Sequence, residues 1–206
     1  MSEPLLPLFP LAVVLLPSNT LPLHIFEDRY KEMIGQALAT GEEFGVVLAA
    51  DGGIARVGCT ATVEEVTKRY PDGRLDIVTL GRRRFAIHEI DQGMAYVRGE
   101  VEFFSDEETE SPPPLRERAL EVCREVGPSG RELLDDPQLS FRLAGGIDDV
   151  EFRQQMLMSR SEADRLRRLI EFVPRYLVRQ QRIDRMKRAA GHNGHSHHRS
   201  AGSEPG

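Results

Sequence analysis

A ten-residue stretch, SDEETESPPP from Ser105 to Pro114, divides the chain into two parts with different patterns of apolar residues. Before it, short apolar runs are interrupted by glycine and proline, a pattern typical of strands and turns. After it, apolar residues recur with helical spacing. The stretch itself is acidic and rich in proline, which suits a linker. The sequence therefore predicts an α+β protein with a β-rich domain at 1–104, a linker at 105–114 and a helical subdomain at 115–190.

The β-rich part begins with a strand-like segment and one helix. The run PLFPLAVVLLP predicts a strand with prolines near its ends. Apolar residues then recur at i, i+4, i+7 and i+8, which predicts an amphipathic helix with Gly41 as its C-terminal cap. The inner face of this helix would consist of Phe26, Tyr30, Met33, Ile34, Ala37 and Leu38.

The following segments predict further strands. EFGVVLAA is a buried strand, ARVGCTATVEEVTKRY and RLDIVTLG form a hairpin around an Asp-Gly turn, and RRFAIHEI is another strand. In AYVRGEVEFF, strict alternation places Phe103 on the apolar face and Tyr96 on the opposite face with the charged residues. Several short strands with one early helix predict a small, highly twisted β-barrel or pseudobarrel.

The second part predicts a set of helices. A long final helix would begin at Ser161, which has the spacing of a capping box with Asp164. Pro174 is expected to kink or end this helix, because proline lacks the amide donor and clashes with the preceding turn. The earlier helices are expected at about 115–126, 137–143 and 150–158.

Charge is distributed unevenly along the chain, whose net charge is -6. Residues 1–110 contain 10 basic and 19 acidic residues, whereas residues 156–190 contain 10 basic and 4 acidic residues. An acidic first part argues against binding of a phosphate backbone there, because each phosphate contact needs a cation. The basic late helix could contact an anionic partner, although a solvated helix face is the interpretation we favour.

The sequence predicts a cytoplasmic protein without membrane spans. No uninterrupted apolar stretch reaches the roughly 18 residues that a membrane helix needs. The N-terminus carries Glu3 and no basic residue before Arg29, the wrong charge pattern for a secretory signal. Cys59 and Cys123 have no CxxC spacing and no further cysteine to complete a zinc site, so we expect two buried free thiols.

Common catalytic motifs are absent from the sequence. No lysine follows a glycine, so the phosphate-binding GxxxxGK[ST] loop is missing, and GxGxxG, GxSxG and HExxH are missing too. His24 lies close to Glu27 and could act as a general base, but no nucleophile is visible beside it. Glu27 and Arg29 are two residues apart, a spacing that points apart on a helix, so we expect them to make separate contacts. We therefore predict no catalytic residue and no cofactor.

The segment GRRRFAIHEI carries three consecutive arginines, Arg82 to Arg84, beside Phe85. One hypothesis is nucleic-acid binding, with Phe85 as a stacking platform. The alternative, which we favour, is that Gly81 permits a bend, Phe85 and Ile87 point inward, and the arginines pair with carboxylates. His88, in the same segment, is expected to be structural.

The last residues, 191–206, are expected to be disordered. They contain the only cluster of residue types typical of metal ligands, although specific binding requires a preformed site. We predict no metal site and keep four residues as weak candidates. These are His192, His195, His197 and His198.

The sequence resembles a known family over nearly all of its length except the linker and tail. The stretch from LPLFPLAVVLLP through PLHIFEDRY to EEFGVVL, residues 6–48, is closely similar to the start of the Lon substrate-binding domain, the N-terminal domain of ATP-dependent Lon proteases. VGCTATVEEV, LGRRRFAIHEI and RQQMLMSRSEADRLRRLIEFV extend the similarity.

The resemblance implies a PUA-like β-barrel followed by a helical subdomain, in a family associated with recognition of unfolded or damaged proteins. The missing ATPase motif implies a stand-alone bacterial form without ATPase and peptidase modules, for which a separate protease is a possible partner. Nucleic-acid binding by the PUA-like fold and an enzyme centred on His24 remain alternatives. The oligomeric state is not predicted. The partner-binding candidates, near the strand-to-helix junction and a cleft between barrel and helices, are Phe9, Pro22, His24, Phe26, Arg29 and Tyr30.

Overall fold

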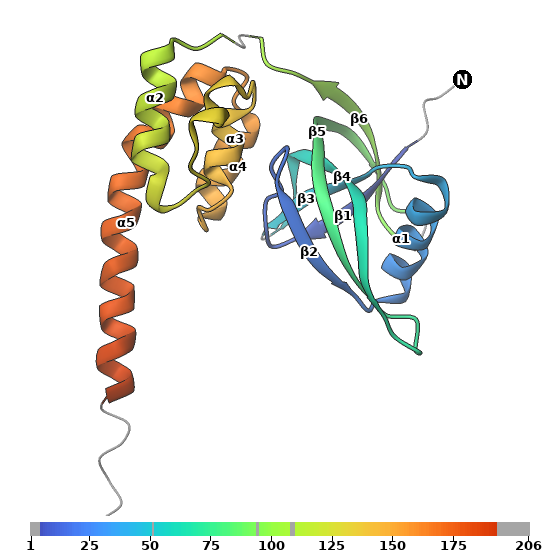
Figure 1. Ribbon diagram of the computed structural model, residues 1–206. Coiled ribbons are helices and arrows are strands. Elements are labelled where there is room, and N and C mark those ends of the chain that lie inside the picture. Colours follow the sequence, from blue (N-terminus) through green and yellow to red (C-terminus); the bar gives the residue numbers. More distant parts are fainter. Residues whose placement is uncertain (1–4, 51, 94, 108–109, 193–206) are drawn as a thin grey trace, which may run out of the picture.

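The computed structural model describes residues 5–50, 52–93, 95–107 and 110–192, and shows a β-barrel beside a group of helices (Figure 1). The strands are β1 (Leu6–Leu11), β2 (Thr20–Ile25), β3 (Phe44–Ala50), β4 (Gly53–Arg69), β5 (Leu75–Asp91) and β6 (Arg98–Phe104). The helices are α1 (Asp28–Thr40), α2 (Pro113–Val122), α3 (Leu139–Ala144), α4 (Val150–Met158) and α5 (Glu162–His192), with short 3-10 helices η1 (Cys123–Glu125) and η2 (Arg131–Asp135). None of the helices among the described residues combines the length and apolar content needed to span a bilayer.

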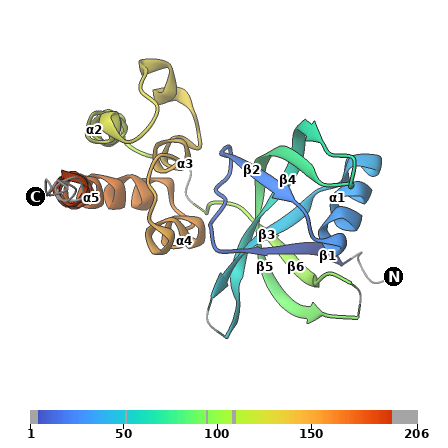
Figure 2. The same ribbon diagram turned by 90° about the horizontal axis from the view of Figure 1, so that it is seen from below.

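The six strands form one sheet in the order β2-β5-β4-β3-β1-β6, and a further pairing of β5 with β6 closes it into a barrel. β1 and β3 pair in parallel, and the other pairs are antiparallel. β4 and β5 are each 17 residues long, and β2 pairs with the first part of β5. The predicted α+β class and barrel are confirmed. α1 covers the side of the barrel away from the helical subdomain (Figures 1 and 2).

β5 is one continuous strand, so the prediction of two separate strands in this region is wrong. The strand passes through Gly81, where the chain of the β1–β2 connection comes very close. A Cβ at Gly81 would lie 2.2 Å from the carbonyl oxygen of Leu16. The Gly81 amide donates to the carbonyl of Asn19 at 2.9 Å. Glycine is required at this position for close backbone approach.

α1 follows the sequence pattern in its body but not at its start. Gly41 has φ 72° and caps the helix as predicted, and Tyr30, Met33 and Ile34 are buried. Phe26 was expected on the same face, and this is wrong because the helix begins only at Asp28. The side chain of Phe26 precedes the first turn and is 57% exposed.

The two aromatic residues around β6 have the opposite burial to the prediction. Tyr96 is 5% exposed and Phe103 is 42% exposed. β6 begins at Arg98, so the strand alternation does not extend back to Tyr96. The Tyr96 hydroxyl donates to Gln36 Oε1 of α1 at 3.1 Å, and the Arg83 guanidinium covers the ring of Phe103 at 3.9 Å.

The helical subdomain contains all the predicted helices, but its last helix is longer than expected. The Asp164 amide donates to Ser161 Oγ at 3.3 Å, which confirms the cap, whereas the Asp164 carboxylate accepts from Ser159 Oγ instead of completing the box. α5 does not end at Pro174 but continues to His192. Burial of Leu166, Leu169 and Val173 anchors the preceding turns, and such tertiary packing offsets the lost hydrogen bond.

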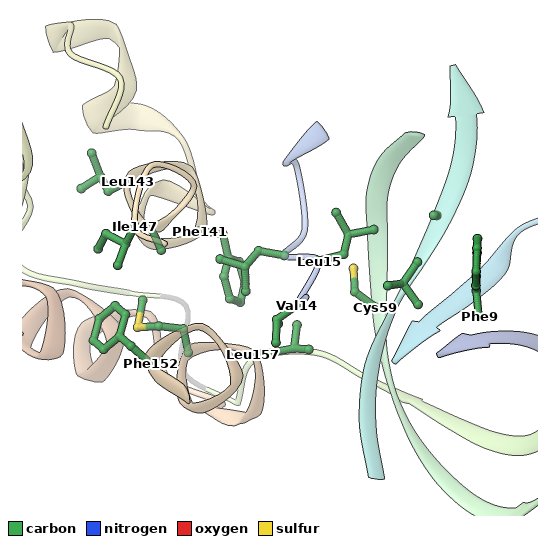
Figure 3. Packing of buried hydrophobic residues seen from close by; sticks show 14 of the residues in the cluster. Phe9, Val14, Leu15, Cys59, Phe141, Leu143, Ile147, Phe152 and Leu157 are labelled. Atoms are coloured by element: carbon green, nitrogen blue, oxygen red, sulfur yellow. The ribbon is translucent and has the colours of Figure 1, made fainter. Parts of the chain in front are cut away.

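The barrel and the helical subdomain share one hydrophobic core. Val14, Leu15 and Leu16, in the β1–β2 connection, are buried, and Figure 3 shows Val14 and Leu15 between Phe141 and Leu157 on one side and the barrel on the other. The cleft that we predicted between barrel and helices is therefore filled by packed side chains at this junction.

Candidate functional site

The outer face of β2 carries a group of exposed polar and aromatic side chains. Pro22 and His24 are exposed and alternate with the less exposed Leu21, Leu23 and Ile25, as expected for a strand with one buried face. The rings of His24 and Phe26 stack with centroids 5.9 Å apart. The ring of Tyr70 meets His24 edge-on at 5.7 Å. We call Pro22, His24, Phe26 and Tyr70 the β2 aromatic surface.

Asp76 fixes the polar atoms of this surface from the neighbouring strand. His24 and Asp76 are direct partners in the β2–β5 register, and His24 Nδ1 lies 2.5 Å from Asp76 Oδ1. The Tyr70 hydroxyl donates to Asp76 Oδ2 at 2.9 Å. These hydrogen bonds hold the pKa of Asp76 below its ordinary value, and the one with His24 contributes more than the one with Tyr70. Lys68 and Arg74 add cations 4.4 and 4.7 Å from the Tyr70 ring centre.

The pair of His24 and Asp76 has the geometry of an oriented imidazole, but neither cysteine supplies it with a nucleophile. Burial raises the pKa values of Cys59 and Cys123 to about 12, so neither thiol is available as a thiolate. Both are free and buried, as predicted. Glu27, the expected neighbour of His24, binds Arg29 instead.

The contact between Glu27 and Arg29 corrects the expectation that these residues point apart. Arg29 Nη2 lies 2.7 Å from Glu27 Oε2. Glu27 is the N-cap of α1 and has extended backbone angles, φ -74° and ψ 135°, so the helical geometry behind the prediction does not apply.

The six partner-binding candidates fall into two groups. Phe9 and Tyr30 are 6% and 7% exposed, and their ring centroids lie 4.1 Å apart, so they are part of the core. Pro22, His24, Phe26 and Arg29 are exposed. Sequence reasoning missed Tyr70, because the hairpin and the β2–β5 register bring it to His24, which no local pattern shows.

Each of the three consecutive arginines has a carboxylate partner, as we favoured. Arg82 lies 2.8 Å from Glu64, Arg83 lies 3.0 Å from Glu43, and Arg84 binds Asp106. Phe85 is fully buried and cannot stack on a base. The segment is therefore a poor nucleic-acid site.

Arg84 and Asp106 belong to a buried group of charges at the junction between barrel and helices. Arg165 Nη2 lies 2.5 Å from Asp106 Oδ2 and 2.7 Å from Glu162 Oε2. Glu162 also contacts Ser140, whose hydroxyl donates a hydrogen bond to the Glu162 carboxylate at 2.6 Å. We call Arg84, Asp106, Ser140, Glu162 and Arg165 the junction ionic cluster.

Asp106 connects the two parts of the molecule within this cluster. Burial alone would raise the pKa of Asp106, but its hydrogen bond to Arg165 and the charges of Arg165 and Arg84 outweigh burial and hold the pKa below 3.8. Arg84 also donates to the backbone carbonyls of Leu157 and Ser159, at 3.2 and 2.5 Å. Asp106, which we assigned to a linker, thus bridges the two parts with a side chain that is only 11% exposed.

The weak metal candidates fall at the end of the chain. His195, His197 and His198 lie outside the described residues, as does the side chain of His192. Within the described ranges no group of three or more potential ligands is close enough to hold a metal ion.

His88, the other histidine of the barrel, is exposed and lies 3.2 Å from Glu102.

Comparison with known proteins identifies relatives over most of the chain. The family described as the ATP-dependent protease La (LON) substrate-binding domain matches residues 5–175. A curated Lon protease of Flavobacterium johnsoniae is 29% identical over 111 residues, which are 50% of this chain and 14% of that protein. The chain thus corresponds to a small part of that relative, and the match does not include a catalytic domain.

Two solved structures have a similar fold. The crystal structure of a Lon N-terminal domain protein from Xanthomonas campestris is 29% identical, with a TM-score of 0.70 over 82% of this chain and 99% of that chain. The N-terminal domain of Mycobacterium avium complex Lon protease is 19% identical, with a TM-score of 0.62 over 83% and 98% of the two chains.

Proposed function

This chain belongs to the Lon substrate-binding domain family, and we propose that it is a non-catalytic module that binds unfolded or misfolded protein segments at the β2 aromatic surface. The observation that carries the proposal is Phe26, a large aromatic side chain that is 57% exposed and stacks on His24. Exposed apolar side chains surrounded by polar ones are typical of protein-binding sites.

The chemistry of the surface fits an extended apolar segment. Phe26 and Pro22 offer apolar contacts, while Asp76 holds the rings of His24 and Tyr70 in fixed positions. Rigid aromatic anchors of this kind bind at low entropic cost. β2 is at the end of the sheet order, but Pro22 removes one backbone donor from it, so we propose recognition through side chains rather than strand addition.

Further features of this proposal come from the sequence. We propose that the module acts without its own ATPase or peptidase, in the cytoplasm, and that a separate protease receives the bound protein. Residues 1–206 contain no GxxxxGK[ST] loop, so they do not themselves supply a phosphate-binding site of that type. The pairing of Arg82 to Arg84 with carboxylates supports a protein over a nucleic acid as the partner.

The experiment measures binding of a reduced and alkylated, permanently unfolded model protein by fluorescence anisotropy. We expect binding by the wild-type chain, slower aggregation of the model protein, and weaker binding by Phe26→Ser. Phe103→Ser is the matched control, because Phe103 is also an exposed phenylalanine of the barrel but lies on β6. Absence of binding at tens of micromolar, or equal losses in both variants, would refute the proposal.

A further inference from the structure

The C-terminal half of α5 carries an exposed basic face for which the fold provides no partner. Figure 1 shows this half of the helix running beyond the other helices. The helix is anchored just before this half by Val173 and Tyr176, which are 0% and 7% exposed and define its inner side. The residues that share the outer side, at spacings of three and four, form what we call the α5 basic face. They are Arg175, Val178, Arg179, Arg182, Arg185 and Met186.

Only one of the four arginines on this face has an ion-pair partner among the described residues. Arg179 lies 2.6 Å from Asp149 of the α4 N-cap. Arg175, Arg182 and Arg185 have no ion-pair partner within the described part of the chain. This contrasts with Arg82 to Arg84, each of which has a carboxylate partner.

Apolar side chains lie between these arginines. Val178 is 52% exposed and Met186 is 73% exposed. Val178 also lines a shallow hollow with Pro174 and the flanking arginines, whose aliphatic stems form its walls. A ligand that contacts only through anionic groups would leave these apolar atoms in water, so the face favours a ligand with both apolar and acidic groups.

We propose that the α5 basic face binds an acidic amphipathic segment of a partner protein, with carboxylates on the arginines and an apolar side chain over Val178. Opposite charges give such an interface its specificity and its rate of association. The surface lies on a different element from the β2 aromatic surface, so this proposal goes beyond the function proposed above and does not depend on it.

Other occupants fit the charges or the apolar atoms less well. A second copy of the same face would bring like charges together, which costs free energy. Residues 193–206 contain one acidic residue, Glu204, and no aliphatic residue larger than alanine other than proline, so this segment matches neither feature. Phosphate contacts alone leave Val178 and Met186 unused, and the acidic barrel opposes a long phosphate backbone.

The test uses a synthetic peptide of about 18 residues, long enough to form a helix, with leucine at helical spacing and glutamate elsewhere. We expect binding to the full chain that weakens as salt rises from about 0.05 to about 0.5 M. The double variant Arg182→Glu with Arg185→Glu, and separately Val178→Ser, should each weaken binding about tenfold. The double variant Lys187→Glu with Arg188→Glu is the matched control, because these exposed cations of α5 point away from this face at 3.6 residues per turn.

Three comparison probes decide between occupants. A peptide with lysine in place of glutamate should not bind, and a glutamate peptide without leucine should bind much more weakly. Equal binding of either peptide would overturn the proposal. It would also be overturned if oligo(dT) bound more tightly than the peptide, or if the chain formed dimers in solution that Arg182→Glu abolished. Phe26→Ser should leave peptide binding unchanged, which separates failure of this proposal from failure of the proposed function.

Discussion

Arginine performs two different tasks in two regions of this protein. In the junction ionic cluster, Arg84 and Arg165 are 5% and 0% exposed and bind carboxylates and carbonyl groups. On the α5 basic face, Arg175 and Arg182 are exposed and have no ion-pair partner within the described residues. The same guanidinium group connects two parts of the fold in the first region and is available to a partner in the second.

Burial explains this difference. A buried charge is tolerated only when it is paired and hydrogen-bonded, so removing one partner leaves an expensive charge behind. An exposed arginine is stabilised by water, and its loss changes stability little. Substitutions in the two regions should therefore affect different measurements, namely stability at the junction and binding on α5.

The largest effect is expected for Arg165→Ala. This change removes the guanidinium 2.7 Å from the fully buried Glu162 and leaves only the longer contact with Arg116, at 4.0 Å, so it should lower the free energy of unfolding by about 3–5 kcal/mol. Urea unfolding followed by circular dichroism measures the loss. A loss below about 1 kcal/mol would show that the junction charges are as dispensable as surface pairs.

Asp106→Asn tests the junction ionic cluster through the pH dependence of the free energy of unfolding. The amide loses charge-assisted hydrogen bonds to Arg84 and Arg165, and the free energy of unfolding at neutral pH should fall by about 1.5–3 kcal/mol. Because the folded-state pKa of Asp106 is lowered, its contribution is complete above the ordinary value of 3.8 and is lost as pH falls below it.

Wild type and Asp106→Asn should therefore converge in stability as the pH falls through and below 3.8. Chemical unfolding at a series of pH values tests this. Asp135→Asn, a change at an exposed aspartate, provides the control. A difference between wild type and Asp106→Asn that stays constant with pH would contradict the assignment.

Two arginines of the triple-arginine segment, Arg84 and Arg82, give a smaller and closely matched comparison. Arg84→Lys keeps the charge but loses the planar fork that reaches Asp106 and two carbonyl groups, and should destabilise by about 1–2 kcal/mol. Arg82→Lys, at an exposed pair with Glu64, should change stability by less than about 0.5 kcal/mol. Thermal unfolding of both variants measures the difference, and equal shifts would remove the distinction by burial.

The smallest effect on stability is expected for Arg182→Ala. Its side chain is exposed on α5, so the free energy of unfolding should change by less than about 0.5 kcal/mol. The same urea experiment as for Arg165→Ala applies. A larger loss would mean that the α5 basic face is part of the fold rather than a surface for a partner.

The sequence predicted the elements well where one local period governs them. The α1 core residues Met33 and Ile34, the hairpin around Gly73 and the helix at Val150–Met158 all follow from spacing and turn chemistry. Errors arose at element ends. Phe26 and Tyr96 lie just outside their helix and strand, where the period that was applied to them no longer holds.

The candidate surface could be predicted only in part. Pro22, His24 and Phe26 were identified from one short segment, whereas Tyr70 and Asp76 reach His24 through strand register, and His24 and Asp76 are 52 positions apart. Asp106 was missed for a different reason, because its acidic and proline-rich neighbourhood is typical of a linker. Only the tertiary contact with Arg84 and Arg165 reveals its role.

The buried β1–β2 connection couples unfolding of the barrel to unfolding of the helices. Leu15 and Leu16 are 2% and 0% exposed, and with Val14 they join the barrel and the helices in one core cluster. Neither part can lose its structure without exposing apolar area of the other, so we expect a single calorimetric transition with equal calorimetric and van't Hoff enthalpies. We expect an exchanged barrel to support the helical part only if it presents the same three side chains to it.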